Sequence, residues 1–335
     1  PSERAIAYER RPEVTTGTIA VARVRTELVH PEKRATLAFL ITGFVALLVG
    51  ALIGPLQALN YAGIDVYSYL PVLASYYQGL TLHGVLNALV FTTFAITGLM
   101  LYLPAREMDM RPNMNWVWAA YWLMLGGLVM AGIAVLARTS SVMYTFYPPL
   151  QAHPAFYIGL TLVVVGSWGW VYRMIQEWRI ARRVRGDRPV SLAMHATAAN
   201  AMLWALCTPG VAIEMLFHLI PWSLGIKETV DPILARSLFW FFGHPLVYFW
   251  ILPAYTLWYT VLPRLAGGRL FSEPLGRMVF AIFLIISTPV GFHHQFQDPG
   301  IPASWKLLHT FLTMAISFPS LVTAFTICAS LEVAG

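Results

Sequence analysis

The sequence predicts an all-α fold, a polytopic bundle of helices that crosses a lipid bilayer. The mean hydropathy is +0.63 and only 11% of the 335 residues are charged, whereas about a quarter of the residues in a soluble domain are charged. The apolar residues gather in runs of about 20 or more, and at about 1.5 Å per helical residue such a run crosses a hydrocarbon core of about 30 Å. Lipid is therefore the predicted solvent of most of the chain.

The runs divide the chain into a tail and one membrane domain. Residues 1–34 are polar and mixed in charge, which predicts a tail without a cleaved signal peptide and leaves insertion to the first span. Residues 35–335 form the predicted membrane domain. Its eight predicted spans cover residues 35–58, 80–104, 115–137, 152–176, 193–221, 229–262, 275–296 and 305–331.

The basic residues indicate the orientation of the bundle. A net charge of +6 and a pI near 9.4 would suit a nucleic-acid partner. However, 18 of the 22 Lys and Arg residues fall in the tail and in three segments that alternating spans place on one face, 105–114, 173–191 and 263–277. The positive-inside rule explains this charge without nucleic acid and predicts that both ends are cytoplasmic. The arginine run 179–188 is interpreted as part of this signal, with docking of lipid or a partner as the alternative.

Four of the nine histidines lie deep within predicted spans, namely His83, His244, His293 and His294. An ionisable side chain at the centre of a bilayer costs about 3 kcal/mol, so it usually faces the bundle interior, water or a metal. A hydrogen-bonded interhelical histidine is the alternative for any one of them. Four together favour a role as ligands.

His244 lies in the middle of the longest span, between Trp240 and Tyr248. The i, i+4 spacing places all three side chains on one face of a helix. Pro245 cannot donate a backbone hydrogen bond and distorts the preceding turn, which re-aims the imidazole. We expect this turn to present a ligand.

His293 and His294 are adjacent and follow Pro289 and Gly291. On a regular helix neighbouring side chains diverge by about 100°, but a proline and a glycine bend or loosen the backbone so that both rings can face one ion. Together with His244 they predict a three-histidine site. Copper, zinc, iron and nickel all accept three imidazoles, and spacing does not choose among them.

His83 stands apart on the second predicted span, next to Gly84. A glycine lets a bulky group approach the backbone closely. A porphyrin needs both a coordinating imidazole and a cleft between helices, so an axial haem ligand is one interpretation of this residue.

Three motifs together resemble subunit I of the haem–copper oxidases, most closely the B-type cytochrome c oxidases of thermophilic bacteria. They are Leu-His-Gly-Val-Leu-Asn at 82–87, Gly-His-Pro-Leu-Val-Tyr-Phe-Trp at 243–250 and Thr-Pro-Val-Gly-Phe-His-His-Gln-Phe at 288–296. The resemblance extends from about residue 30 to the end. Since the family has about a dozen helices and a later one supplies the remaining haem ligands, we expect this sequence to be the N-terminal portion of such a subunit.

The resemblance implies roles for the intramembrane residues. His83 would be an axial ligand of a low-spin haem of b type, and His244, His293 and His294 would hold the copper called CuB. Tyr248 would carry the family's covalent link to His244 and would supply an electron and a proton to oxygen chemistry. A high-spin haem of a type would complete the cofactors.

The resemblance also implies the activity and the partners. The subunit would reduce O₂ to water with electrons from cytochrome c and translocate protons across the plasma membrane of a prokaryote. A dinuclear copper site would lie on a separate subunit II, since Cys207 and Cys328 are too few to supply one here. Nitric oxide reductase of the same superfamily is the first alternative, and a catalytically silent membrane fragment is the second. Tyr248 and the lack of a glutamate near His244 argue against the reductase.

A proton route is the last expectation. Leu246 stands where A-type members usually have a gating glutamate, so the resemblance implies the single route of the B type. The alternative for its Ser and Thr members is a hydrogen bond back to their own helix carbonyls. The candidates are Tyr248, Tyr255, Tyr259, Ser320, Thr323 and Thr326, with Thr313 and Ser272 as further members. The other histidines, His30, His153, His195, His218 and His309, are expected to have surface or interhelical roles.

Overall fold

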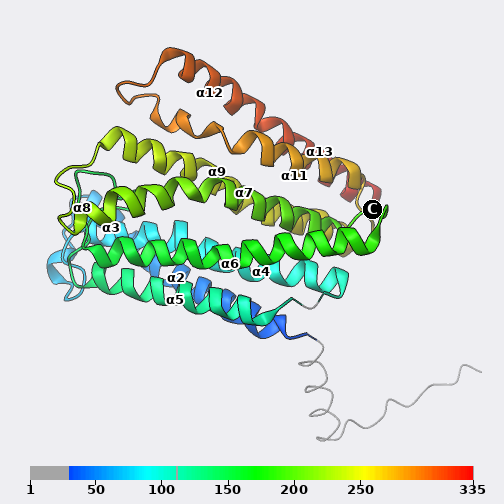
Figure 1. Ribbon diagram of the computed structural model, residues 1–335, viewed down its shortest axis with the longest axis horizontal. Helices are drawn as coiled ribbons and strands as arrows, with labels where there is room; N and C mark the ends of the chain where they lie inside the picture. Colours follow the sequence, from blue (N-terminus) through cyan, green and yellow to red (C-terminus); the bar gives the residue numbers. More distant parts are fainter. Residues whose placement is uncertain (1–29, 111, 335) are drawn as a thin grey trace, which may run out of the picture.

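The protein is a bundle of long helices, as Figure 1 shows. The computed structural model describes residues 30–110 and 112–334, and within these residues the chain is helical and contains no β-strand. The prediction of an all-α fold is confirmed. Most of the predicted tail, residues 1–34, lies outside the described residues.

Seven helical segments of the described chain are long and apolar enough to cross a membrane, judged by length and composition. Three of them contain a change of helix type or a short extension, and in one a turn residue, Ile316, separates two helices. In order they are α2 (Glu32–Tyr61), α3, η2 and α4 (Tyr76–Gly84, Val85–Phe91, Thr92–Met108), α5 (Met114–Leu136), α6 (Pro154–Arg185), α7, η3 and α8 (Leu192–Glu214, Met215–Leu219, Ile220–Ser223), α9 and α10 (Pro232–Thr260, Leu262–Leu265), and α12 and α13 (Ala303–Ala315, Ser317–Ala334).

The remaining predicted span, 275–296, is interrupted. Its α-helix α11 (Glu273–Ser287) is followed by the 3₁₀ segment η4 (Val290–Gln295). Pro289 lies at the junction and cannot donate a backbone hydrogen bond, so the regular helix ends before it. The prediction of eight spans therefore holds for seven continuous ones, and the eighth is a broken helix that carries His293 and His294.

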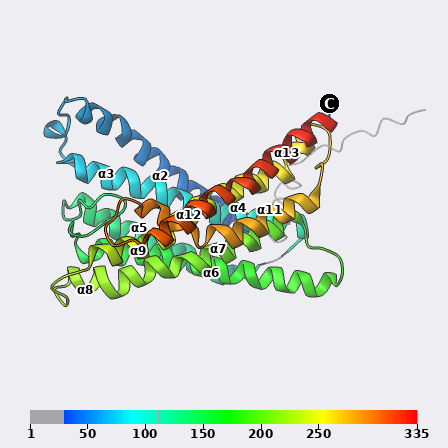
Figure 2. The same cartoon turned by 90° about the horizontal axis from the view of Figure 1, so that it is seen from above.

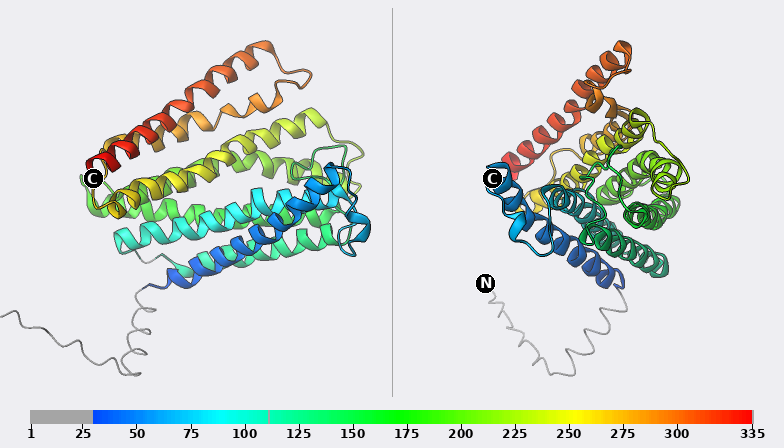
Figure 3. Two further views of the ribbon diagram at one scale, coloured as in Figure 1. Left: turned by 180° about the vertical axis from the view of Figure 1, so that it is seen from behind. Right: turned by 90° about the vertical axis from the view of Figure 1, so that its left-hand side faces the viewer.

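Successive helices alternate in direction, and the basic segments collect at one end of the bundle. In Figure 1 the start of α2, the end of α13 and the links α4–α5, α6–α7 and α10–α11 lie at the right-hand end. Figure 2 shows α2 and α13 inclined in opposite senses, and Figure 3 gives the view from behind and the view along the bundle. The basic end holds Arg106, Arg185, Arg188 and Arg269 in the described chain.

Close packing fixes the middle of the bundle. A Cβ atom on Gly127 of α5 would lie 2.4 Å from the carbonyl oxygen of Gly159 on α6, so the two backbones are in contact. Small residues allow this approach, which drives helix association where lipid removes the hydrophobic effect. The rings of Trp204 on α7 and Phe249 on α9 stack with centroids 4.0 Å apart. Helix α9, which carries His244, is thereby held against α7.

Candidate metal centre

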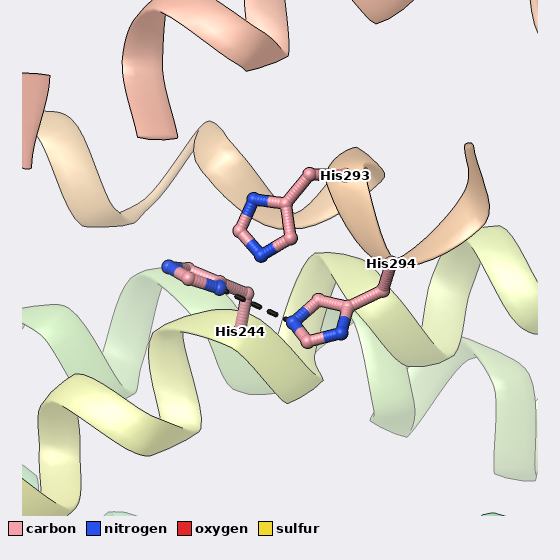
Figure 4. Close-up of side chains that lie close together, drawn as sticks. All are labelled: His244, His293 and His294. Atoms are coloured by element: carbon pink, nitrogen blue, oxygen red, sulfur yellow. Dashed lines mark hydrogen bonds between the residues drawn. The ribbon is translucent and has the colours of Figure 1, made fainter. Parts of the chain in front are cut away.

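Three histidines converge between α9 and η4 (Figure 4). Ring nitrogens of His244, His293 and His294 all lie within 4.8 Å of one another. Nδ1 of His244 is 3.2 Å from Nε2 of His294, and the ring centroid of His293 is 4.4 Å from those of both other histidines. The structure thus brings together the three residues that the sequence predicted to share one ion.

The local backbone explains how two adjacent residues reach one point. The 3₁₀ segment η4 lies directly on α9, because a Cβ atom on Gly291 would be only 2.1 Å from the carbonyl oxygen of Trp240. Any larger residue at 291 would hold the segment away from His244. The break at Pro289 and the absence of a side chain at Gly291 are therefore the two features that aim His293 and His294 at α9.

Neighbouring side chains orient the imidazoles. The indole of Trp240 stacks on His294 with centroids 3.7 Å apart and 6° between the ring planes. Nδ1 of His293 lies 2.8 Å from the hydroxyl of Thr313 on α12, and that hydroxyl also donates to the carbonyl of His309. Outer contacts of this kind fix the orientation of metal ligands. The buried Nε2 of His244 has no hydrogen-bond partner among the described residues.

An ion pair ties the ends of the two ligand-bearing segments together. The guanidinium of Arg236, in the first turns of α9, lies 2.8 Å from a carboxylate oxygen of Asp298, just after η4. Gln295 donates to Asp298 and is 3.2 Å from the hydroxyl of Ser237. Sequence reasoning missed this group. Its only local signal is the spacing of Gln295 and Asp298, three residues apart.

His83 lies on α3, away from the three-histidine cluster, and is half-buried. Its Nδ1 is 2.7 Å from the carbonyl oxygen of Gly50 on α2 and 3.3 Å from the amide nitrogen of Asn87. Asn87, one turn after His83, was also missed by sequence reasoning, although its i+4 spacing was visible. The remaining ring nitrogen, Nε2, is the atom through which this imidazole can bind a metal.

An apolar cavity of about 200 Å³ lies between Gly84 and the histidine cluster. Gly84 lines it, whereas the neighbouring His83 is not among its lining residues. The cavity leads to His294, and the role of His83 as a haem ligand stays a prediction. Its wall includes Tyr144, Trp240, Leu246 and Trp250.

Several candidates for the polar route form separate contacts between side chains, without showing a route. Tyr248 packs beside His244, with ring centroids 4.8 Å apart. Further along α9, Tyr255 donates to Ser320 at 3.2 Å and Tyr259 donates to Thr323 at 2.9 Å.

Helix back-bonding, the alternative considered for these residues, also occurs. Thr323 and Thr326 each donate to a carbonyl of their own helix, Thr323 while accepting from Tyr259. Ser272 caps the start of α11 by accepting from Leu275, whereas Thr313 contacts His293. The eight candidates therefore do not form one continuous hydrogen-bonded chain among the described residues.

Three of the other histidines, expected to have surface or interhelical roles, make contacts of different kinds. His195 contacts the carbonyl of Arg277 across helices, and His153 caps α6. His309 is fully buried, stacks on Trp305, and has no hydrogen-bond partner for either ring nitrogen in the described chain.

The fold and the cluster define a polytopic helical membrane protein with a three-histidine candidate metal centre. Comparison with known proteins gives the family. The chain belongs to the family described as cytochrome c and quinol oxidase polypeptide I, whose model matches residues 34–334. The resemblance drawn from the sequence motifs is thereby confirmed.

Individual relatives agree with this assignment. The chain is 51% identical to cytochrome c oxidase subunit 1 of Thermus thermophilus over 91% of its own length and 55% of that protein. It is 25% identical to quinol oxidase subunit 1 of Sulfolobus acidocaldarius over 71% of the chain and 48% of that protein. A solved heme-copper terminal oxidase dimer matches with a TM-score of 0.85 and 42% identity, over 91% of this chain and 53% of that one. The chain thus spans about half the length of these relatives.

Proposed function

We propose that this chain is part of the catalytic subunit of a terminal respiratory oxidase, which reduces O₂ to water with electrons from cytochrome c and translocates protons. The arrangement of the site carries the proposal. Ring nitrogens of three histidines lie within 4.8 Å of one another, and the ring centroid of Tyr248 lies 4.8 Å from that of His244. The apolar cavity that ends at His294 supports it, because a small apolar gas can occupy such a space.

Copper is the metal proposed for the cluster. Three imidazoles fit several transition metals, and membership of the family implies haem and copper as cofactors. The donor set fits, since His244 has a buried ring nitrogen without a protein partner, and outer contacts orient His293 and His294. When bound, the copper and the haems supply the site for O₂ and the electrons for its reduction.

His83 is the proposed axial ligand of a low-spin haem of b type. The contact between its Nδ1 and the Gly50 carbonyl supports this role, because a histidine that donates from one ring nitrogen presents the other as a lone pair. The ring is half-buried and so retains an open side. A high-spin haem of a type is proposed as the second haem.

Tyr248 is the proposed source of a proton, and of the covalent link to His244. Its position one turn after His244 puts the phenol on the same helix face. Tyr255, Tyr259, Ser320 and Thr323 would continue a route for protons toward the basic end, with Thr326, Thr313 and Ser272 as flanking members. Water molecules would have to join the separate cross-links into a route.

The proposed setting is the plasma membrane of a prokaryote, with both ends of this chain cytoplasmic. The clustering of basic residues at the end of the bundle where α2 begins and α13 ends supports this orientation. The proposed partners are a subunit II with a dinuclear copper site and cytochrome c as the electron donor. The proposal also includes the boundary near residue 34 between the N-terminal tail and the membrane domain.

The experiment uses the complete oxidase complex that contains this chain. Metal content, haem spectra and O₂ consumption with reduced cytochrome c are measured for the native protein and for His244→Ala, His83→Leu and the control His153→Gln. We expect His244→Ala to lose copper and His83→Leu to lose the low-spin haem spectrum, while His153→Gln retains both. Reduction of nitric oxide without O₂ turnover would favour the reductase, and absence of both activities in the native complex would favour a silent protein.

A further inference from the structure

A second site is suggested by a groove on the outer side of the bundle, between α6 and α7. It has a volume of about 480 Å³ and is lined by Trp168, Val171, Tyr172, Ile175, Gln176 and Arg179 of α6, and by Ala205 and Pro209 of α7. The α6 residues follow the 3.6-residue repeat and so form one continuous face of the helix. The groove shares none of its lining residues with the cavity beside His294.

The two helices shape the groove through specific residues. Ala205 and Pro209 are one turn apart on α7, and the small side chain of Ala205 leaves room that a larger residue would fill. At one end of the groove the indole of Trp168 donates to the hydroxyl of Thr208 at 2.8 Å, which joins the two helices. The indole ring of Trp168 is therefore held in place and closes this end of the groove with an apolar surface.

The opposite end is polar and positive. Arg179 is exposed and makes no ion pair or hydrogen bond with another residue in the described chain. The nearest acid on α6, Glu177, is engaged by Arg173. Gln176 and Tyr172 are joined by a hydrogen bond of 2.5 Å and provide a polar rim. An anion at this end would meet an unpaired guanidinium.

The arginines that follow add to this charge. Arg183 is one turn beyond Arg179 and is exposed. Arg182 lies over the ring of Trp178, with 5.1 Å between the guanidinium carbon and the ring centroid. Between residues 173 and 188 the chain has six arginines and two acidic residues. Positive charge therefore lies at the polar end of the groove and continues along the chain beyond it.

The length of the groove matches one leaflet. Trp168 and Arg179 are separated by eleven residues, or about 16 Å along a helix. Half of a hydrocarbon core is about 15 Å. Because α6 spans Pro154–Arg185, Trp168 lies near its middle and Arg179 near its basic end. The groove thus extends from the depth of the headgroups to the middle of the membrane.

We propose that this groove binds one anionic phospholipid, with an acyl chain between α6 and α7 and the phosphate on Arg179. Each part of the lipid meets its complement: the acyl chain lies along Ile175, Val171 and Trp168, and the phosphate accepts charge-assisted hydrogen bonds from the guanidinium. The site is independent of the redox centre. Its failure would leave the proposed oxidase function untouched.

The test uses the complete, detergent-solubilised oxidase complex after removal of bound lipid. Native mass spectrometry measures the binding of phosphatidylglycerol and of phosphatidylcholine with the same acyl chains. We expect phosphatidylglycerol to bind more tightly, and Arg179→Gln to weaken it about fivefold. Arg188→Gln removes the same charge from the loop beyond α6 and should leave the affinity unchanged. Ala205→Leu fills the groove and should weaken both lipids.

A second measurement locates the lipid without relying on any variant. Phosphatidylglycerol with a photoreactive group on its acyl chain is bound to the native complex, irradiated, and the labelled peptides are identified. Labels on the segments around Val171 and Ala205 are expected. Labels on another subunit that covers this face, equal binding of the two lipids, or equal effects of Arg179→Gln and Arg188→Gln would each overturn the proposal.

Discussion

The indole ring of Trp240 lies flat against the imidazole ring of His294, with 3.7 Å between centroids and 6° between planes. Trp240 is one turn before His244 on α9, so a single helix supplies both a candidate ligand and the surface that orients another. The backbone of Trp240 also contacts η4, since its carbonyl oxygen occupies the space where a side chain on Gly291 would lie. Trp240 therefore sets both the position and the orientation of His294.

Replacement of Trp240 by leucine tests this role. The ring of His294 would lose its stacking surface, and we expect copper affinity to fall about tenfold, the lower end of the effect of outer-shell contacts. Copper bound to the purified complex is titrated with a chelator of known affinity. Trp258→Leu is the matched control, because Trp258 lies on the same helix and is 45% exposed. Equal copper affinity in the two variants would contradict the role of the stack.

Gly291→Ala tests the close approach of η4 to α9. Its Cβ atom would lie 2.1 Å from the Trp240 carbonyl oxygen, so the segment must move outward and take His293 and His294 with it. We expect a loss of about 1–3 kcal/mol in stability from overpacking, together with loss of copper. Thermal unfolding and metal analysis measure the two effects.

Gly132→Ala is the control for that variant. No atom lies within 4 Å of the Cβ position at Gly132 on α5, and alanine is the better helix former by up to about 1 kcal/mol. Its stability should be unchanged or slightly higher, with copper retained. A Gly291→Ala protein that binds copper normally would show that η4 does not depend on this contact.

The sequence predicted the spans from local apolar runs, and it predicted the three-histidine cluster from the depth of these histidines in the spans. Apolar runs define helices that cross a membrane, and Pro289 and Gly291 indicate a bend wherever they occur in a helix. The break in the span 275–296 and the 3₁₀ conformation of η4 were harder to predict from the sequence, because they depend on the distance between η4 and α9. The contact between Gly291 and Trp240 joins residues 51 positions apart.

Contacts over long sequence separations account for the other differences. His83 contacts the carbonyl of Gly50, and His293 contacts the hydroxyl of Thr313. In both pairs the partner lies on another helix, so no rule of sequence spacing predicts the contact. The ion pair of Arg236 and Asp298 is of the same kind. Polar stripes on α9 and α13 were visible in the sequence. Which tyrosine meets which hydroxyl depends on the register between the helices.

Tyr259→Phe tests the proposed proton route. It removes only the hydroxyl that donates to Thr323 at 2.9 Å, so packing against Phe280 should persist. We expect O₂ turnover to fall about 10- to 100-fold. This is at or below the smallest usual rate effect of a proton-transferring side chain, because a water molecule can take over part of the function of the hydroxyl. Haem and copper content should be unchanged.

Ser317→Ala is the matched control on the helix opposite Tyr259. Ser317 is exposed and its hydroxyl bonds to the Met314 carbonyl, away from the tyrosines. Its removal should leave turnover intact. If Tyr259→Phe also kept native turnover, or lost turnover together with its cofactors, the proton route through this residue would be rejected.

Tyr248→Phe is the most direct test of oxygen chemistry at this centre. The ring beside His244 and its contact with Phe283 remain, since their centroid distances of 4.8 Å and 5.3 Å involve the ring alone. Only the hydroxyl is lost, and with it the proton and the covalent link proposed for this residue. We expect turnover with O₂ to fall by about 10²-fold or more, with both haems and copper still bound. Oxygen consumption with reduced cytochrome c, haem spectra and copper content are measured on the same preparation. Native oxygen consumption by this variant, with all cofactors present, would show that the phenol takes no part in the reaction.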